Sequence, residues 1–144
     1  MKVTMLLSDF AQVIQGKLYI MGGGWSLTGP VPSLSAIAVK IEVPWTQTNR
    51  KHEFRVELID ADGHPVVMVP PTGEGPVVLD GHFEVGRPPG MPPGTPLDVP
   101  LAMTIPPMPL APGRYVWRLS IDGASHDDWE VAFTVRAQAP AAPG

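Results

Sequence analysis

The sequence predicts an all-β protein, a single antiparallel β-sandwich of eight or nine short strands. Apolar residues alternate with polar ones through most of the chain, and this period of two is that of a strand with one buried face. No long window shows the three- and four-residue apolar spacing of an amphipathic helix. The 15 glycines and 19 prolines gather between the alternating stretches, where turns are needed.

A chain of 144 residues is long enough for one domain. We assign residues 1–137 to the β-sandwich domain and residues 138–144, which are rich in alanine and proline, to a flexible C-terminal tail. The hydrophobic fraction of 44% and the charged fraction of 17% are those of a packed globular protein rather than a disordered one.

Charge and hydropathy argue against two classes of partner. A net charge of −4 disfavours nucleic acid, whose phosphates attract basic proteins. No apolar run approaches the roughly 20 residues of a membrane span, so no membrane partner is expected. Cysteine is absent, and the first residues alternate like a strand instead of forming the apolar segment of a signal peptide. The expected location is therefore the cytoplasm.

The first half of the chain is expected to hold five strands, each with apolar side chains at every second position. The first strand alternates from Val3 to Leu7, and residues 9–15 are the one place where a helical turn is expected. Asp62-Gly63 between two alternating stretches is typical of a hairpin turn. The expected strands are residues 2–8, 17–25, 34–43, 52–60 and 65–69.

The second half of the chain is expected to hold four strands with the same alternation. Trp117 and Trp129 fall in phase with the apolar residues of the last two, so both are expected to face the core. Prolines concentrate in the connections and near strand ends, which suits a sandwich with open sheet edges better than a closed barrel. The expected strands are residues 77–85, 97–105, 114–121 and 129–136.

The segment LAPGRYVWRLSIDG, residues 110–123, carries the most specific fold signal. A Pro-Gly turn delivers Tyr115 to the start of an amphipathic strand that ends in Asp122-Gly123. This arrangement resembles the corner of immunoglobulin-like sandwiches, in which a tyrosine hydroxyl bonds back across the turn. The resemblance implies an immunoglobulin-like sandwich but no function.

The segment SDFAQVIQGKLYIMGGGW, residues 8–25, resembles the opening of an uncharacterised family of small bacterial proteins, found mainly in high-GC actinobacteria. The family shares the GKLYI strand, the GGGW turn and a GRY-W-L-DG segment near the end of the chain. The resemblance implies one domain and a bacterial, cytoplasmic origin. It carries no activity, substrate or site residue to this sequence.

The run Gly22, Gly23, Gly24 and Trp25 is the first candidate site. A phosphate-binding loop needs a helix N-terminus after its glycines, whereas this run continues into further glycine and proline. We therefore expect a tight bulge or a crossover between sheets. Trp25 either caps the core beside that bend or, if exposed, begins a binding surface.

Metal-ligand and acid–base candidates are weak. The loop from Asp60 to His64 lacks the further ligands of a calcium site and is expected to be a hairpin. His82 shares an outer strand face with Asp80 and Glu84, a row that is either a solvated face or a site for a metal-assisted hydrolase. No metal and no cofactor is predicted.

Two further features could bind a ligand. The connection RPPGMPPGTP, residues 87–96, is either a stiff connector or an extended segment that a partner recognises. Arg87 and Met91 are its candidate contacts. Trp25 and Trp45 lie beside turns and are the candidate members of an aromatic platform for a small molecule or a carbohydrate.

These observations favour a non-catalytic interaction or structural module over an enzyme. It would act through the end loops or through a sheet edge offered to another copy, which would give a homo-oligomer. The protein partner is not identified by the sequence. The alternatives are a small-molecule or carbohydrate-binding module and, third, a metal-assisted hydrolase. The candidate binding residues are Gly22, Gly23, Gly24, Trp25, Trp45, Arg87 and Met91.

Overall fold

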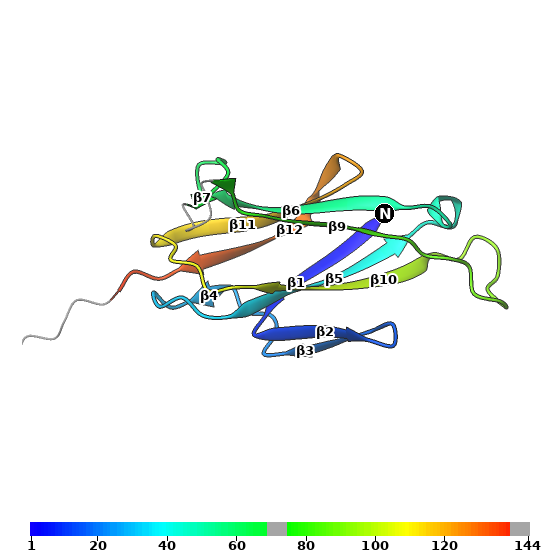
Figure 1. The fold of residues 1–144 in the computed structure, drawn as a ribbon, viewed down its shortest axis with the longest axis horizontal. Helices are drawn as coiled ribbons and strands as arrows, with labels where there is room; N and C mark the ends of the chain where they lie inside the picture. Colours follow the sequence, from blue (N-terminus) through cyan, green and yellow to red (C-terminus); the bar gives the residue numbers. More distant parts are fainter. Residues whose placement is uncertain (69–74, 139–144) are drawn as a thin grey trace, which may run out of the picture.

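A computed structural model describes residues 1–68 and 75–138, which form two β-sheets packed face to face (Figure 1). One sheet has three strands in the order β1 (Lys2–Ser8), β5 (Ser35–Val43) and β10 (Leu97–Ile105). The other has five strands in the order β4 (Leu27–Thr28), β12 (Ala124–Val135), β11 (Gly113–Ile121), β6 (His52–Asp60) and β9 (Val78–Phe83). The predicted all-β sandwich is confirmed.

Two short ribbons complete the described part of the chain. β2 (Phe10–Ile14) pairs with β3 (Lys17–Met21), and β7 (Val67–Met68) pairs with β8 (Gly75–Pro76). These ribbons raise the number of strands above the predicted eight or nine. A single 3₁₀ turn, η1, spans Trp45–Gln47. The described residues include no helix with the length and hydropathy of a membrane span.

The predicted strand boundaries hold best where the alternation is longest. The strands at residues 2–8, 52–60 and 97–105 match β1, β6 and β10 at both ends. The strand expected at residues 17–25 ends at Met21, because Gly22 adopts a positive φ of 63° that breaks the extended backbone. Residue 69 of the fifth expected strand and residues 139–144 of the expected tail lie outside the described residues.

The core lies between the two sheets and consists of the apolar side chains on their facing sides. Ile37, Val39 and Ile41 of β5 are fully buried against the five-stranded sheet. Trp117 and Leu119 of β11 fill the opposite side. The predicted inward phase of Trp117 is confirmed, and Trp129 packs partly buried at the margin of the same cluster.

The helical turn expected at residues 9–15 is wrong, because these residues form β2. Gln15 and Gly16 both adopt a positive φ, 50° and 75°, as the two central residues of a type I′ hairpin turn do. That turn returns the chain directly into β3, and the five residues of β2 pair with those of β3. The backbone groups of β2 therefore bond to those of β3 and not to one another, as they would in a helix.

The β2–β3 ribbon lies on the outer face of the three-stranded sheet, away from the core (Figure 1). Its inner side packs through small residues: Ala11 is buried against Ala36 and Ala38 of β5, with Leu18 at the margin. The part of β5 around Ala36 and Ala38 is consequently buried on both faces, whereas Lys40 further along the outer face is exposed. Because alanine side chains are short, the ribbon approaches the sheet closely and covers the outer face of β5 at Ala36 and Ala38.

The predicted tyrosine corner is present at the start of β11. The Tyr115 hydroxyl donates a 2.6 Å hydrogen bond to the backbone oxygen of Ala111. Burial, with a smaller contribution from the charge of Asp60, raises the pKa of the phenol, so the hydroxyl remains a donor.

One pairing departs from the predicted antiparallel pattern: β4 lies parallel to β12.

Candidate functional site

The outer face of the β2–β3 ribbon carries several exposed apolar side chains. Directly opposite residues share a face of an antiparallel pair. Since Ala11 faces the sheet, the pairs on either side of it face solvent. The register gives the three outward pairs as Phe10–Met21, Gln12–Tyr19 and Ile14–Lys17.

Four of these six outward side chains are large and apolar. The exposed fraction is 44% for Phe10, 43% for Ile14, 51% for Tyr19 and 66% for Met21. Val13 and Ile20, on the inner side, are also partly exposed along the margins of the ribbon. We call the six apolar residues of the ribbon the ribbon patch: Phe10, Val13, Ile14, Tyr19, Ile20 and Met21. Soluble monomers rarely expose contiguous apolar patches larger than a few hundred Å², and such patches mark binding surfaces.

Two charges flank the ribbon patch at opposite ends. Lys17 follows the hairpin turn at the tip, and Asp9 precedes β2 at the base. The Asp9 backbone N–H donates to the carbonyls of Met21 and Gly22, at 3.1 and 3.2 Å. The ribbon therefore carries a positive tip and a negative base with an apolar centre between them.

The glycine run secures the base of this ribbon. A Cβ at Gly22 would overlap the Asp9 carboxylate, and one at Gly23 would approach Ile20 and Leu6 too closely. The Gly24 N–H donates a 2.7 Å hydrogen bond to the Leu7 carbonyl and ties the run back to β1. The structure thus gives Gly22, Gly23 and Gly24 a conformational role, as the tight bend that was expected.

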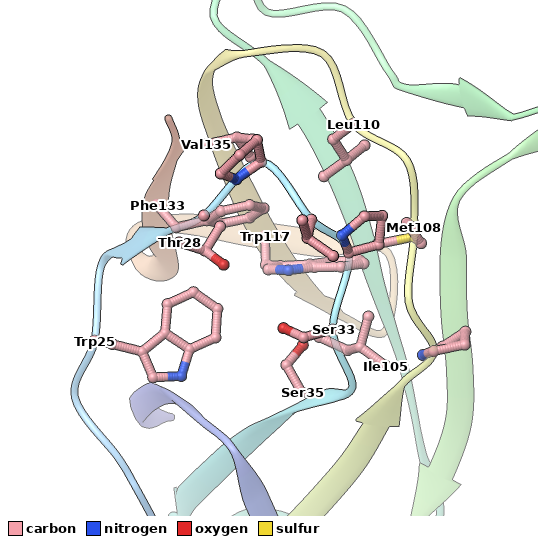
Figure 2. A pocket seen from close by; sticks show the side chains of 15 residues that line it. Trp25, Thr28, Ser33, Ser35, Ile105, Met108, Leu110, Trp117, Phe133 and Val135 are labelled. Atoms are coloured by element: carbon pink, nitrogen blue, oxygen red, sulfur yellow. The ribbon is translucent and has the colours of Figure 1, made fainter. Parts of the chain in front are cut away.

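Trp25 closes one end of the core beside a small cavity (Figure 2). It is half-buried and meets Phe133 edge to face at 6.2 Å between ring centroids. Its indole N–H is buried and has no acceptor among the described residues. The cavity beside it has a volume of about 50 Å³.

Trp45, Arg87 and Met91 lie beyond the other end of β5. The Arg87 guanidinium lies 4.1 Å from the centre of the Trp45 ring and donates to the Trp45 carbonyl at 2.7 Å. Trp45 also lines an open groove of about 550 Å³ beside Lys2 and Glu42. Met91 is partly buried within the proline-rich connection. Trp25 and Trp45 are therefore too far apart to form one aromatic platform.

The predicted hairpin at Asp60–His64 is confirmed. Asp60 Oδ1 accepts the N–H groups of Asp62 and His64, at 2.9 and 3.0 Å. Asp60, Asp62 and His64 are also the one group of potential metal ligands that the described residues bring within 4.8 Å. The turn already uses the Asp60 carboxylate. His82 does not belong to this group; it lies on an edge strand opposite Glu53.

His52 is a buried histidine with two acceptors. Its Nδ1 lies 2.7 Å from Asp122 Oδ2, and its Nε2 lies 2.8 Å from the Gln47 carbonyl. The hydrogen bond from His52, with a further one from the Glu53 N–H, lowers the pKa of the Asp122 carboxyl. This pair fastens β6 to the turn after β11.

Sequence reasoning did not find the ribbon patch, although a signal was present. The stretch FAQVIQGKLYIM, residues 10–21, has apolar residues on both sides of an alternating pattern. A ribbon with one face on a sheet needs only one apolar face. The second apolar face therefore indicated a further contact.

Comparison with known proteins places this fold in a family. No curated protein and no solved structure matches the chain. A model of a family of unknown function, DUF6941, matches residues 3–136. The match spans both sheets and the β2–β3 ribbon. The chain therefore belongs to the DUF6941 family of unknown function.

Proposed function

We propose that this protein is a non-catalytic interaction module whose binding surface is the ribbon patch. The observation that carries the proposal is the exposure of Phe10, Tyr19 and Met21 on a ribbon whose other face is already packed. Together the six side chains leave on the order of 500 Å² of apolar surface in contact with water. Covering that surface with a partner removes an unfavourable contact with solvent.

The ribbon is well suited to recognition because it is held in place before binding. The alanine contacts fix its inner side, and the backbone bonds of Asp9 and Gly24 fix its base. A preformed surface loses little conformational entropy when a partner binds. This rigidity supports binding at the ribbon in place of the end loops suggested by the sequence.

A non-catalytic role is supported by the structural use of the groups that chemistry would need. His52 is held between Asp122 and Gln47, and Asp60 caps its own turn. The exposed side chains of Phe10, Ile14 and Met21 offer contact area but no acid, base or nucleophile. Binding is therefore the function that this surface serves best.

Site-specific photo-crosslinking in cells that express the protein tests the proposal. A photoreactive amino acid replaces Tyr19 in one variant and Arg118, an exposed residue of the five-stranded sheet, in a matched control. We expect a discrete covalent adduct from position 19 and none from position 118. Equal labelling at the two positions, or no adduct at position 19, would contradict a binding role for the ribbon.

A second candidate function is small-molecule or carbohydrate binding at the Trp45 groove. The groove has room for a sugar-sized ligand, and Trp45 offers an aromatic surface beside the paired charges of Lys2 and Glu42, 3.7 Å apart. Titration with a panel of sugars should then change tryptophan fluorescence. The response should be lost in Trp45→Ala and kept in Trp25→Phe; a response that survives Trp45→Ala would exclude this site.

Finer points of the proposal concern fold type, origin and location. The Tyr115 hydrogen bond supports an immunoglobulin-like arrangement of the sandwich. A cysteine-free chain is suited to the reducing cytoplasm. The GKLYI and GGGW motifs support a bacterial, mainly actinobacterial, family.

A further inference from the structure

We infer that the occupant of the ribbon patch is a second copy of this chain, packed face to face across a two-fold axis with the two ribbons antiparallel. The inference rests on the proposed function and names its partner. It differs from oligomerisation through a sheet edge, because the contacts are made by side chains of the outer ribbon face. Three features of that face lead to a second copy.

The first feature is charge. A two-fold axis parallel to the strands would place Lys17 at the tip over Lys17 of the other copy. An axis perpendicular to the strands, in the plane of the interface, places the tip of each ribbon over the base of the other. Each Lys17 then lies near Asp9 of its partner, so opposite charges meet at both ends. Charge complementarity therefore favours the antiparallel arrangement.

The second feature is the distribution of the apolar side chains. Phe10 and Met21 form the pair at the base, and Ile14 lies near the tip beside Lys17. In the antiparallel arrangement the Ile14 side chain of each copy packs against Phe10 and Met21 of the other. Tyr19, in the middle of the ribbon, approaches its own symmetry mate. A self-complementary surface of this kind is what a two-fold interface requires.

The third feature is area. Two outer ribbon faces would bury less than about 1,000 Å² in total, which is the range of weak and transient protein interfaces. An interface of that size fits a reversible dimer rather than a permanent one. A larger obligate interface would need more apolar surface than the ribbon offers.

Sedimentation equilibrium of the full chain over a concentration series tests the dimer. We expect the mass to rise from that of the 15.4 kDa chain to twice that value. Tyr19→Lys should keep the protein monomeric. Arg118→Glu, on the far sheet, should dimerise like the parent protein. Circular dichroism establishes that each variant is folded.

A charge-reversal cycle tests the antiparallel arrangement. Lys17→Asp and Asp9→Lys should each weaken dimerisation about tenfold, and the double variant should recover most of the loss. A purely structural role for either residue would not give recovery.

The outcomes separate this inference from the proposed function. A monomer at all concentrations, or single reversals that the double variant does not repair, would overturn the antiparallel dimer. If position 19 then crosslinks to a different protein in cells, the interaction module stands and only the identity of the partner is wrong. If position 19 forms no adduct of any kind, both proposals fail.

Discussion

The two faces of the β1–β5–β10 sheet solve the same physical problem in different ways. The inner face buries branched side chains, such as Ile37 and Ile41, against a complete second sheet. The outer face carries Ala36 and Ala38, and around these residues it is covered by a narrow ribbon that has its own apolar exterior. The inner face is covered entirely within one chain. On the outer side, the ribbon covers the alanines of the sheet but exposes apolar side chains of its own, which are available to a partner.

The largest difference in stability between substitutions on the two faces is expected at the centre of the core. Trp117→Ala removes a fully buried indole and should lower the free energy of unfolding by about 3–5 kcal/mol. Phe10→Ala, an aromatic truncation on the exposed ribbon, should lower it by less than about 1 kcal/mol. Urea denaturation measures both values. Similar losses for the two variants would mean that the ribbon is part of the folding core.

The contact between ribbon and sheet should tolerate little extra volume. Ala38→Leu inserts three carbons into the alanine interface and should cost about 1–3 kcal/mol. Relative to the parent protein, this variant should exchange its backbone hydrogens faster in β2 and β3, and the increase there should be larger than in β6 and β11. Ala102→Leu, at the margin of the same interface, should cost less. Unchanged exchange in the ribbon would show that its packing does not depend on close approach to β5.

A polar contact closes the inner core near His52. Asp122→Asn keeps a residue suited to the positive φ of 52° but removes the charge that His52 meets, at a cost of about 1 kcal/mol because Asp122 is partly solvated. Since folding lowers the pKa of Asp122, its contribution is present at neutral pH and lost as the pH falls through the lowered value.

Denaturant titrations of both proteins between pH 7 and pH 2 measure this effect. The stability difference between the parent protein and Asp122→Asn should shrink toward acid pH. A difference that stays constant, or that grows as the pH falls, would contradict a stabilising role for the Asp122 carboxylate. Glu53→Gln, which keeps the neighbouring backbone contact, serves as the control.

The smallest effect on folding is expected on the exterior of the ribbon. Met21→Gln should change the free energy of unfolding by no more than about 0.5 kcal/mol, because Met21 is the most exposed member of the ribbon patch. The same variant should weaken self-association severalfold by sedimentation. If Met21→Gln destabilises the monomer strongly and leaves association unchanged, the contrast between the two faces is lost.

The period-two pattern was sufficient to predict the sandwich, because a long strand with one buried face has apolar residues at every second position. The ribbon was missed for a physical reason. Phe10, Val13 and Ile14 have a spacing that also fits one turn of a helix, and only pairing with residues 17–21 makes them a strand. The contacts of His52 with Asp122 and of Trp45 with Arg87 join residues far apart in sequence. Spacing alone does not reveal such pairs.

Carbene footprinting at several protein concentrations tests the role of the ribbon most directly, because the label reports the exposure of individual side chains. In dilute solution Phe10, Tyr19 and Met21 should be labelled as readily as Leu27 and Val31, exposed apolar residues outside the ribbon. In concentrated solution we expect labelling of the three ribbon residues to fall while labelling of Leu27 and Val31 stays constant. Equal labelling of the ribbon at all concentrations would contradict this expectation.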